Sequence, residues 1–162
     1  MADDTDIATL RRILSRCRII AVVGISAEWH RPSYFVGKYL LEHGYTMVPV
    51  NPKYAEVLGR RCYPSVTAAT ASGEKIELVD CFRRADDIGP IADEAIAIGA
   101  RCLWMQLGVV NEAAAAKARA AGLDVVMDRC VKIEHGRLFG GLSWAGVNTR
   151  VISSRRPRQL PY

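Results

Sequence analysis

The sequence IIAVVG at residues 19–24 decides the fold class. It is a short apolar run, rich in β-branched residues and closed by a glycine, which is typical of a strand buried on both faces of a parallel sheet. Four more segments with strand character follow at intervals that leave room for a helix between them. They are residues 45–50, 77–82, 102–105 and 125–127.

Helical patterns alternate with these runs. A helix is expected before the first strand, at residues 6–17, and others are expected at 33–44, 65–72, 87–99 and 111–122, with a short one at 55–58. Ser33 and Asn111 are candidate N-caps, and Gly44 is a candidate helix stop. Strands that alternate with helices through short links predict an α/β fold, a single Rossmann-like domain with a doubly wound parallel sheet.

Composition bounds the class of protein. The chain has 162 residues, of which 50% are hydrophobic and 24% charged, so it has enough apolar material for one folded domain. It has no apolar run of the roughly 20 residues that span a bilayer. The N-terminus is acidic where a signal peptide is basic. We therefore expect a cytoplasmic protein with no membrane partner.

The net charge of +5 is concentrated at one end of the chain. Arg150, Arg155, Arg156 and Arg158 lie in the last 13 residues, which contain no acid. Because the remainder is close to neutral, the domain as a whole is not expected to bind nucleic acid. The tail is either a solvated terminus or a contact for an anionic protein partner.

Five cysteines are present, at positions 17, 62, 81, 102 and 130. They show no CxxC spacing and no cluster with histidine, so a zinc site is not expected and the thiols should be reduced. Cys130 differs from the others because Arg129 and Lys132 flank it. Neighbouring cations can lower the pKa of a thiol, which makes Cys130 a candidate nucleophile.

Residues that follow the strands mark the expected ligand edge, because ligands of such sheets bind outside the strand carboxyl ends. Small and polar residues dominate there, at 24–26, 51–53, 83–84, 106–108 and 128–130. Lys53, Arg83, Arg84 and Arg129 add positive charge. This chemistry suits a phosphate-bearing ligand.

Two common nucleotide motifs do not match. In the pattern GxGxxG, the second and third glycines would fall at Ser26 and Trp29. The acid that usually binds the ribose of NAD after the second strand is replaced by Asn51. A GxxxxGK[ST] sequence is also absent, which excludes a P-loop ATPase.

Five segments together resemble the small, single-domain bacterial CoA-binding proteins. They are 22–26 (VVGIS), 49–52 (PVNP), 79–83 (VDCFR), 104–108 (WMQLG) and 128–135 (DRCVKIEH). The resemblance spans about residues 15–138, and this group is similar to the CoA-binding domain of the succinyl-CoA synthetase α subunit. It implies that coenzyme A is bound at the strand carboxyl ends.

The resemblance also implies roles for individual residues. Those near the phosphates and adenosine of CoA would be Gly24, Ser26, Ser33, Asn51, Pro52, Lys53, Phe82 and Arg83. Those toward the pantetheine and its thiol would be Gln106, Gly108 and Cys130. The chain lacks the second domain that carries the synthetase's phosphorylated histidine, so ligase activity is not implied.

The leading hypothesis is a CoA- or acyl-CoA-binding protein without catalysis of its own. One alternative is an NAD(P)- or acyl-CoA-dependent enzyme that uses Cys130 or Asp128, and another is an interaction protein that responds to its ligand. The expected organisation is a helix at 1–17 that packs on the domain, a CoA-binding domain at 18–138, and an Arg-rich extension at 139–162.

Overall fold

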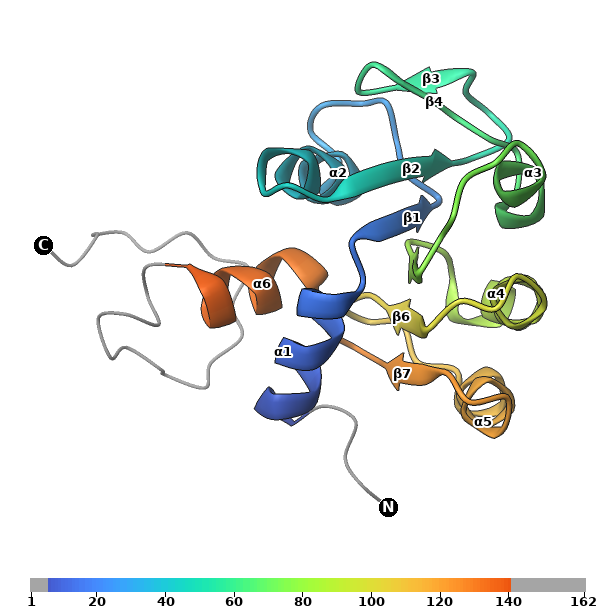
Figure 1. Ribbon diagram of the computed structural model, residues 1–162. Helices are drawn as coiled ribbons and strands as arrows, with labels where there is room; N and C mark the ends of the chain where they lie inside the picture. Colours follow the sequence, from blue (N-terminus) through green and yellow to red (C-terminus); the bar gives the residue numbers. More distant parts are fainter. Residues whose placement is uncertain (1–5, 141–162) are drawn as a thin grey trace, which may run out of the picture.

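The computed structural model describes residues 6–140, which form a five-stranded sheet with helices on both faces (Figure 1). The strands are all parallel, in the order β2-β1-β5-β6-β7. Their bounds are Ile19–Val23 for β1, Thr46–Val50 for β2, Leu78–Cys81 for β5, Cys102–Met105 for β6 and Asp124–Val126 for β7. The predicted α/β fold with a doubly wound parallel sheet is confirmed.

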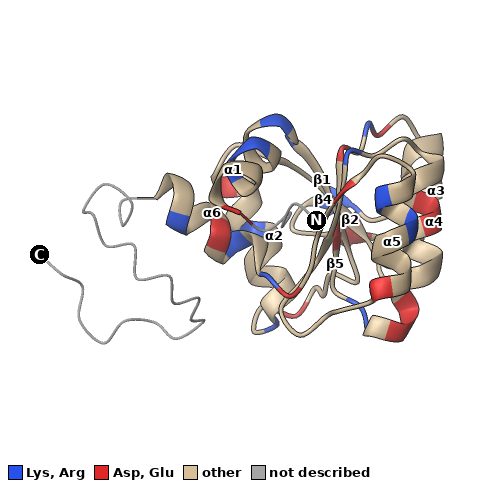
Figure 2. Ribbon diagram, turned by 90° about the horizontal axis from the view of Figure 1, so that it is seen from below, with Lys and Arg blue, Asp and Glu red and all other residues tan. Residues whose placement is uncertain are grey.

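The helices form two outer layers, which Figure 2 shows on either side of the sheet. One layer contains α1 (Ile7–Arg16), α2 (Pro32–Glu42) and α6 (Val131–Phe139). The other contains α3 (Val66–Ala71), α4 (Ile88–Ala97) and α5 (Glu112–Ala120), with the short 3-10 turn η1 (Ala85–Asp87) before α4. Because successive side chains of a strand point to opposite faces, each strand contributes to two separate cores.

Side-chain caps fix the starts of three helices. Asp6 Oδ1 accepts a hydrogen bond from Thr9 N at 2.7 Å, and Ser65 Oγ accepts one from Ala68 N at 3.0 Å. Asn111, the predicted cap of α5, accepts from the N–H of the third residue after it. These bonds satisfy helix N–H groups that have no partner within the helix.

The prediction that Ser33 caps α2 is wrong. The helix begins one residue earlier, at Pro32, and Arg31 is the N-cap residue without a side-chain capping bond. Proline is well suited to the first helical position because its φ is fixed and it has no N–H to satisfy. Ser33 therefore lies inside the first turn, where it is buried.

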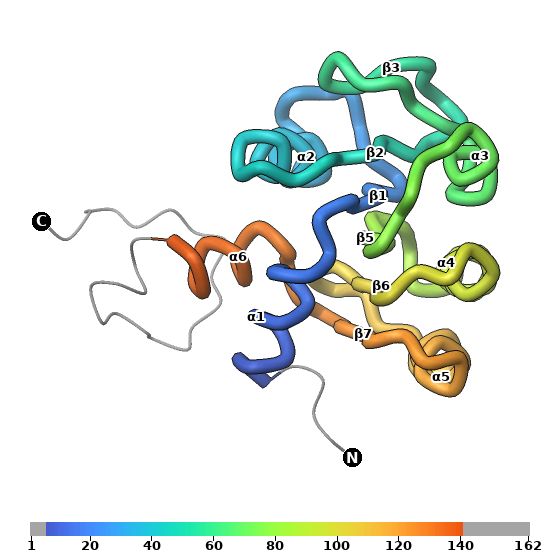
Figure 3. The backbone as a smooth tube through the Cα atoms, in the orientation of Figure 1, coloured from blue at the N-terminus to red at the C-terminus, as the bar shows by residue number. Residues whose placement is uncertain are grey.

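The predicted short helix at residues 55–58 is also wrong. The chain forms an antiparallel hairpin there, with β3 (Glu56–Val57) and β4 (Arg60–Arg61), which lies beyond the β2 edge of the sheet (Figure 3). Its turn places Leu58 and Gly59 at φ values of 54° and 73°. The glycine accepts that left-handed conformation without strain, which favours a two-residue hairpin turn over a helix.

Helix α6 was not predicted from the sequence, although it completes one layer of the fold. Glu134 on this helix is fully buried, and its carboxylate lies 3.3 Å from Arg129 Nη1 and 2.5 Å from Arg137 Nη2. On the facing helix α1, Arg11 donates a hydrogen bond to the carbonyl oxygen of Leu138. These contacts join α6 to the loop before it and to α1.

The expected C-terminal extension begins at the last residue of α6, and its arginines lie outside the described residues. No helix within residues 6–140 has the length and apolar character that crossing a membrane requires.

The substitution Glu134→Gln is expected to lower the free energy of unfolding by roughly 3 kcal/mol, because two partly buried arginines lose their carboxylate partner. Urea unfolding measures this change. The matched control is Asp93→Asn, which removes the exposed ion pair with Lys117 and should cost about 0.5 kcal/mol or less. Equal losses in both variants would contradict the structural role given to Glu134.

Candidate functional site: a cleft at the strand carboxyl ends

A cleft of about 830 Å³ lies at the carboxyl ends of the strands, within the size range of small-molecule sites. The sheet order places its switch point between β1 and β5, whose chains leave toward opposite faces. Nine of the eleven expected site residues line this cleft. They are Gly24, Ser26, Ser33, Asn51, Lys53, Phe82, Arg83, Gln106 and Cys130.

Gly24 occupies the tightest position, directly after β1. Its φ is +85°, and a Cβ atom there would lie 2.2 Å from the carbonyl oxygen of Phe82. The Gly24 N–H donates to Val50 O on one side, while the Phe82 N–H donates to Val23 O on the other. The glycine therefore lets the ends of three strands meet around the cleft.

The first turn of α2 forms one wall. Ser33 Oγ accepts a hydrogen bond from the Ser26 N–H at 2.9 Å, so its hydroxyl proton remains available to donate. The start of a helix carries partial positive charge and favours an anion. Ser33 therefore lines the cleft from the first turn of α2, although it does not cap the helix.

Asn51 ties two loops of the cleft together. Its Nδ2 donates to Ile25 O, and its Oδ1 accepts from the Lys53 N–H, both at 2.9 Å. Both ends of the side-chain amide are therefore occupied by the protein. Asn51 shapes the site and holds Lys53 in place, while the acid that would bind an NAD ribose is absent from this position.

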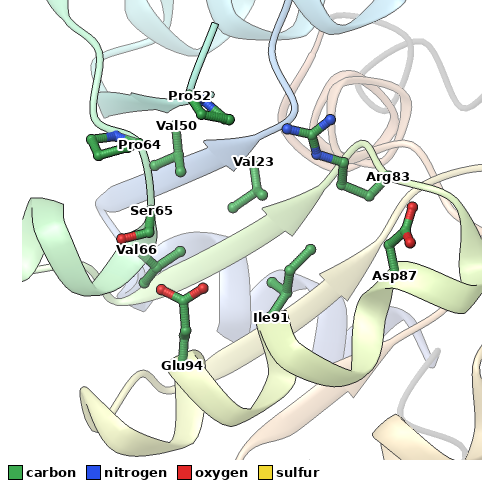
Figure 4. Close-up of a pocket in the computed structure, with 10 residues that line it drawn as sticks. All are labelled: Val23, Val50, Pro52, Pro64, Ser65, Val66, Arg83, Asp87, Ile91 and Glu94. Carbon is green, nitrogen blue, oxygen red and sulfur yellow. The ribbon is translucent and has the colours of Figure 1, made fainter.

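Two cations of the cleft, Lys53 and Arg83, form no ion pair with residues 6–140. Arg83 also borders a second, smaller cavity of about 350 Å³ on the other face of the sheet, which Pro52 and Asp87 line as well (Figure 4). In that view its guanidinium points toward Pro52 and away from the Asp87 carboxylate. Arg83 is therefore free to receive an anion.

Pro52 and Gly108, the other two expected residues, do not line the main cleft. Pro52 faces the smaller cavity, and the Gly108 N–H donates to Asp128 Oδ1 at 2.7 Å. That hydrogen bond stabilises the loop after β6 and gives the Asp128 carboxylate a structural role.

Sequence reasoning missed Tyr54 and Ile133, which also line the cleft. Tyr54 directly follows Lys53, so its place in the strand-end loop was the available signal. Ile133 could not be placed because it lies on the unpredicted helix α6.

The floor of the cleft contains Gln106, which is 4% exposed and directly follows β6. Its Nε2 donates to Oδ1 of Asp80 at 2.5 Å. Asp80 lies in the middle of β5, paired in register with Val22 and Trp104, and it is completely buried. Burial raises the pKa of Asp80 to about 8, while the hydrogen bond from Gln106 acts in the opposite direction.

The expectation of an activated Cys130 thiol is wrong. Burial raises the pKa of Cys130, and the charge of Asp80 adds to this increase. The backbone N–H groups of Ile133 and Lys132 and the charge of Lys132 lower it, but less. Arg129 forms an ion pair with Glu134, so only Lys132 of the two expected cations acts on the sulfur.

The fold and the cleft define a Rossmann-like α/β domain. Along the carboxyl ends of its strands lie two cations without an ion-pair partner among residues 6–140 and the buried amide of Gln106. Residues 18–136 match the family described as the CoA binding domain. The chain therefore belongs to this family.

Relatives span nearly the same length. The uncharacterized protein YneT of Bacillus subtilis is 36% identical over 128 residues, which are 79% of this chain and 93% of that protein. The solved structure of a hypothetical protein from Pyrococcus horikoshii is 45% identical, with a TM-score of 0.81, and the match covers 86% of this chain and 96% of that one.

A shorter match relates the chain to a large enzyme. Over 49 residues, 30% of this chain and 7% of the enzyme, it is 41% identical to the ADP-forming acetate–CoA ligase I of Archaeoglobus fulgidus. The shared portion is therefore a small part of that ligase.

The substitution Gly24→Ala is expected to destabilise the protein by about 2 kcal/mol or more, since the new Cβ meets the Phe82 carbonyl and the backbone has a positive φ. Thermal unfolding measures the loss. Gly89→Ala in α4 is the control, because nothing lies within 4 Å of its Cβ position and alanine favours a helix. A Gly24→Ala protein as stable as Gly89→Ala would contradict the packing described.

Asp80 should make stability depend on pH. Its pKa of about 8 in the folded protein exceeds the ordinary value of 3.8, so the folded state retains a proton that the unfolded chain releases between these values. The contribution is complete below pH 4 and is lost as the pH rises through 8, at a slope on the order of 1 kcal/mol per pH unit.

Urea unfolding at several pH values tests this contribution. The Asp80→Asn variant, which cannot titrate, should resemble the parent near pH 5 and become the more stable of the two at pH 9. Stability curves that stay parallel over this range would show that Asp80 is not the titrating group.

Proposed function

We propose that the cleft binds coenzyme A or an acyl-CoA, with the phosphates at one end and the pantetheine arm at the other. The observation that carries this proposal is that the residues after successive strands change from positively charged to uncharged across the sheet. Lys53 follows β2, Arg83 follows β5, Gln106 follows β6 and Cys130 follows β7, and all four line one cleft.

The end formed by β2, β1 and β5 suits phosphates. It combines Lys53 and Arg83, which form no ion pair within the described part of the chain, with the hydroxyl of Ser33 in the first turn of α2. Arginine and lysine side chains and helix N-termini are the groups that proteins use to bind phosphate. CoA carries a pyrophosphate and a 3′-phosphate, which can use several such groups at once.

The end formed by β6 and β7 suits a neutral chain. Gln106, Leu107, Val109, Cys130 and Ile133 line it. The one arginine close by in sequence, at position 129, is already paired with buried Glu134. The pantetheine arm is an uncharged chain with amide groups, so it matches an apolar wall that offers a single amide.

The site favours binding over catalysis by Cys130. A thiol whose pKa is raised is mostly protonated near neutral pH and is a poor nucleophile. Asp128, the other candidate, accepts the Gly108 N–H and does not line the cleft. Membership of the CoA binding domain family supports the same ligand.

Titration calorimetry on protein freed of ligand is expected to show CoA binding that weakens as salt is added, because charged contacts are screened. Lys53→Ala and Arg83→Ala should each weaken binding roughly tenfold, the value of a lost hydrogen bond to a charged group. Dephospho-CoA should bind less tightly than CoA if either side chain contacts the 3′-phosphate.

Lys75→Ala is the matched control, since Lys75 is exposed and lines a cavity at the amino ends of the strands. It should leave CoA affinity unchanged. The proposal is overturned if millimolar CoA produces neither heat nor a change in melting temperature in the intact chain.

A further inference from the structure

One buried acid has no role in the function proposed so far. Asp80 is fully buried in the central strand β5, at a position where the neighbouring strands place Val22 and Trp104. Its Oδ1 accepts the Gln106 amide, while its Oδ2 has no hydrogen-bond partner among residues 6–140. A leucine there would keep the apolar pattern of the strand and avoid an unpaired oxygen.

The contact with Asp80 decides which end of the Gln106 amide faces the cleft. An amide has an NH₂ donor on one side and an oxygen acceptor on the other. Since Nε2 is held by Asp80, Oε1 is the end left for a ligand. Oε1 makes no hydrogen bond to the described residues, and unlike Asp80 Oδ2 it is not sealed from solvent.

The structure gives this contact as Gln106 Nε2 donating to Asp80 Oδ1. An ionised carboxylate can only accept, so ionised Asp80 enforces this orientation of the amide. In the protonated form the same hydrogen bond is retained when the proton is on Oδ2. Cys130, Cys81 and Cys102 are the other titratable groups whose charge Asp80 affects, and burial keeps all three thiols mostly protonated.

We propose that Asp80 is a positioning residue that holds the Gln106 amide oxygen toward the cleft, where this oxygen accepts an N–H group from the pantetheine arm of CoA. This inference rests on the proposed function and adds a specificity determinant to it. The pantetheine arm has secondary amides whose N–H groups need an acceptor when they leave water. Gln106 Oε1 provides this acceptor at the neutral end of the cleft.

The test compares two ligands. CoA contains the pantetheine arm, and 3′-phospho-ADP is the same nucleotide without it. In the Asp80→Leu protein Gln106 loses its partner and its orientation, so CoA should bind about fivefold more weakly, the value of one neutral hydrogen bond. The affinity for 3′-phospho-ADP should stay within about twofold of the parent value.

Two further variants separate positioning from a structural role. Asp80→Asn retains an oxygen acceptor of the same shape and should bind both ligands like the parent. Gln106→Leu removes the acceptor itself and should weaken CoA binding as much as Asp80→Leu does. The double variant should be no weaker than Gln106→Leu alone, because Asp80 acts only through Gln106.

The outcomes distinguish this inference from the proposed function. If the parent protein binds neither ligand, the proposed function fails. If the parent binds both, three results would each overturn the role of Asp80: unchanged CoA binding by Asp80→Leu, equal weakening of both ligands, or additive losses in the double variant. Should Asp80→Leu not fold, Asp80→Ala takes its place, with the same results expected for the two ligands.

Discussion

The close approach of Gly24 to the carbonyl oxygen of Phe82 is the constraint on which the rest of the site depends. It brings the ends of β1 and β5 together at the point where the chain directions diverge, and it leaves no room for a side chain. Helix α2 then starts on one face and η1 on the other, so the loops that lead into them form the two walls of a cleft. A larger residue at position 24 would separate the strand ends and with them the residues that line the cleft.

Given this arrangement, the order of the strands determines where charged and uncharged side chains lie along the cleft. Neighbouring parallel strands are about 4.8 Å apart, so residues that follow successive strands form a row. In this chain the row runs from Lys53 through Arg83 to Gln106 and Cys130. Positive charge at one end and neutral groups at the other suit a ligand with a charged head and a long uncharged arm. A cleft with the same charge at both ends would not suit such a ligand.

The sequence predicted the features that depend on local pattern. Strands such as β1 were found because buried parallel strands are continuous apolar runs, and most of the lining residues were found because strand ends share one edge. Features that depend on distant contacts were missed. Helix α6 has little amphipathic pattern because a glutamate on its buried face is neutralised by arginines at 129 and 137. The pKa of Cys130 was misjudged because sequence shows flanking cations but not burial.

Asp80 was not predicted as a site residue. It lies inside a buried strand rather than after it, and its side chain is covered by the core. A lone acid in a central strand costs stability, and the free energy of the fold has to come from the two apolar cores around it. Such local costs concentrate at functional positions, where one contact matters more than stability. Asp80 contacts the Nε2 of the buried Gln106 amide. The Oε1 of the same amide belongs to the part of the cleft formed by β6 and β7. The proposed role of Asp80 in directing this amide accounts for the burial of the carboxyl group, even though its Oδ2 has no hydrogen-bond partner among residues 6–140.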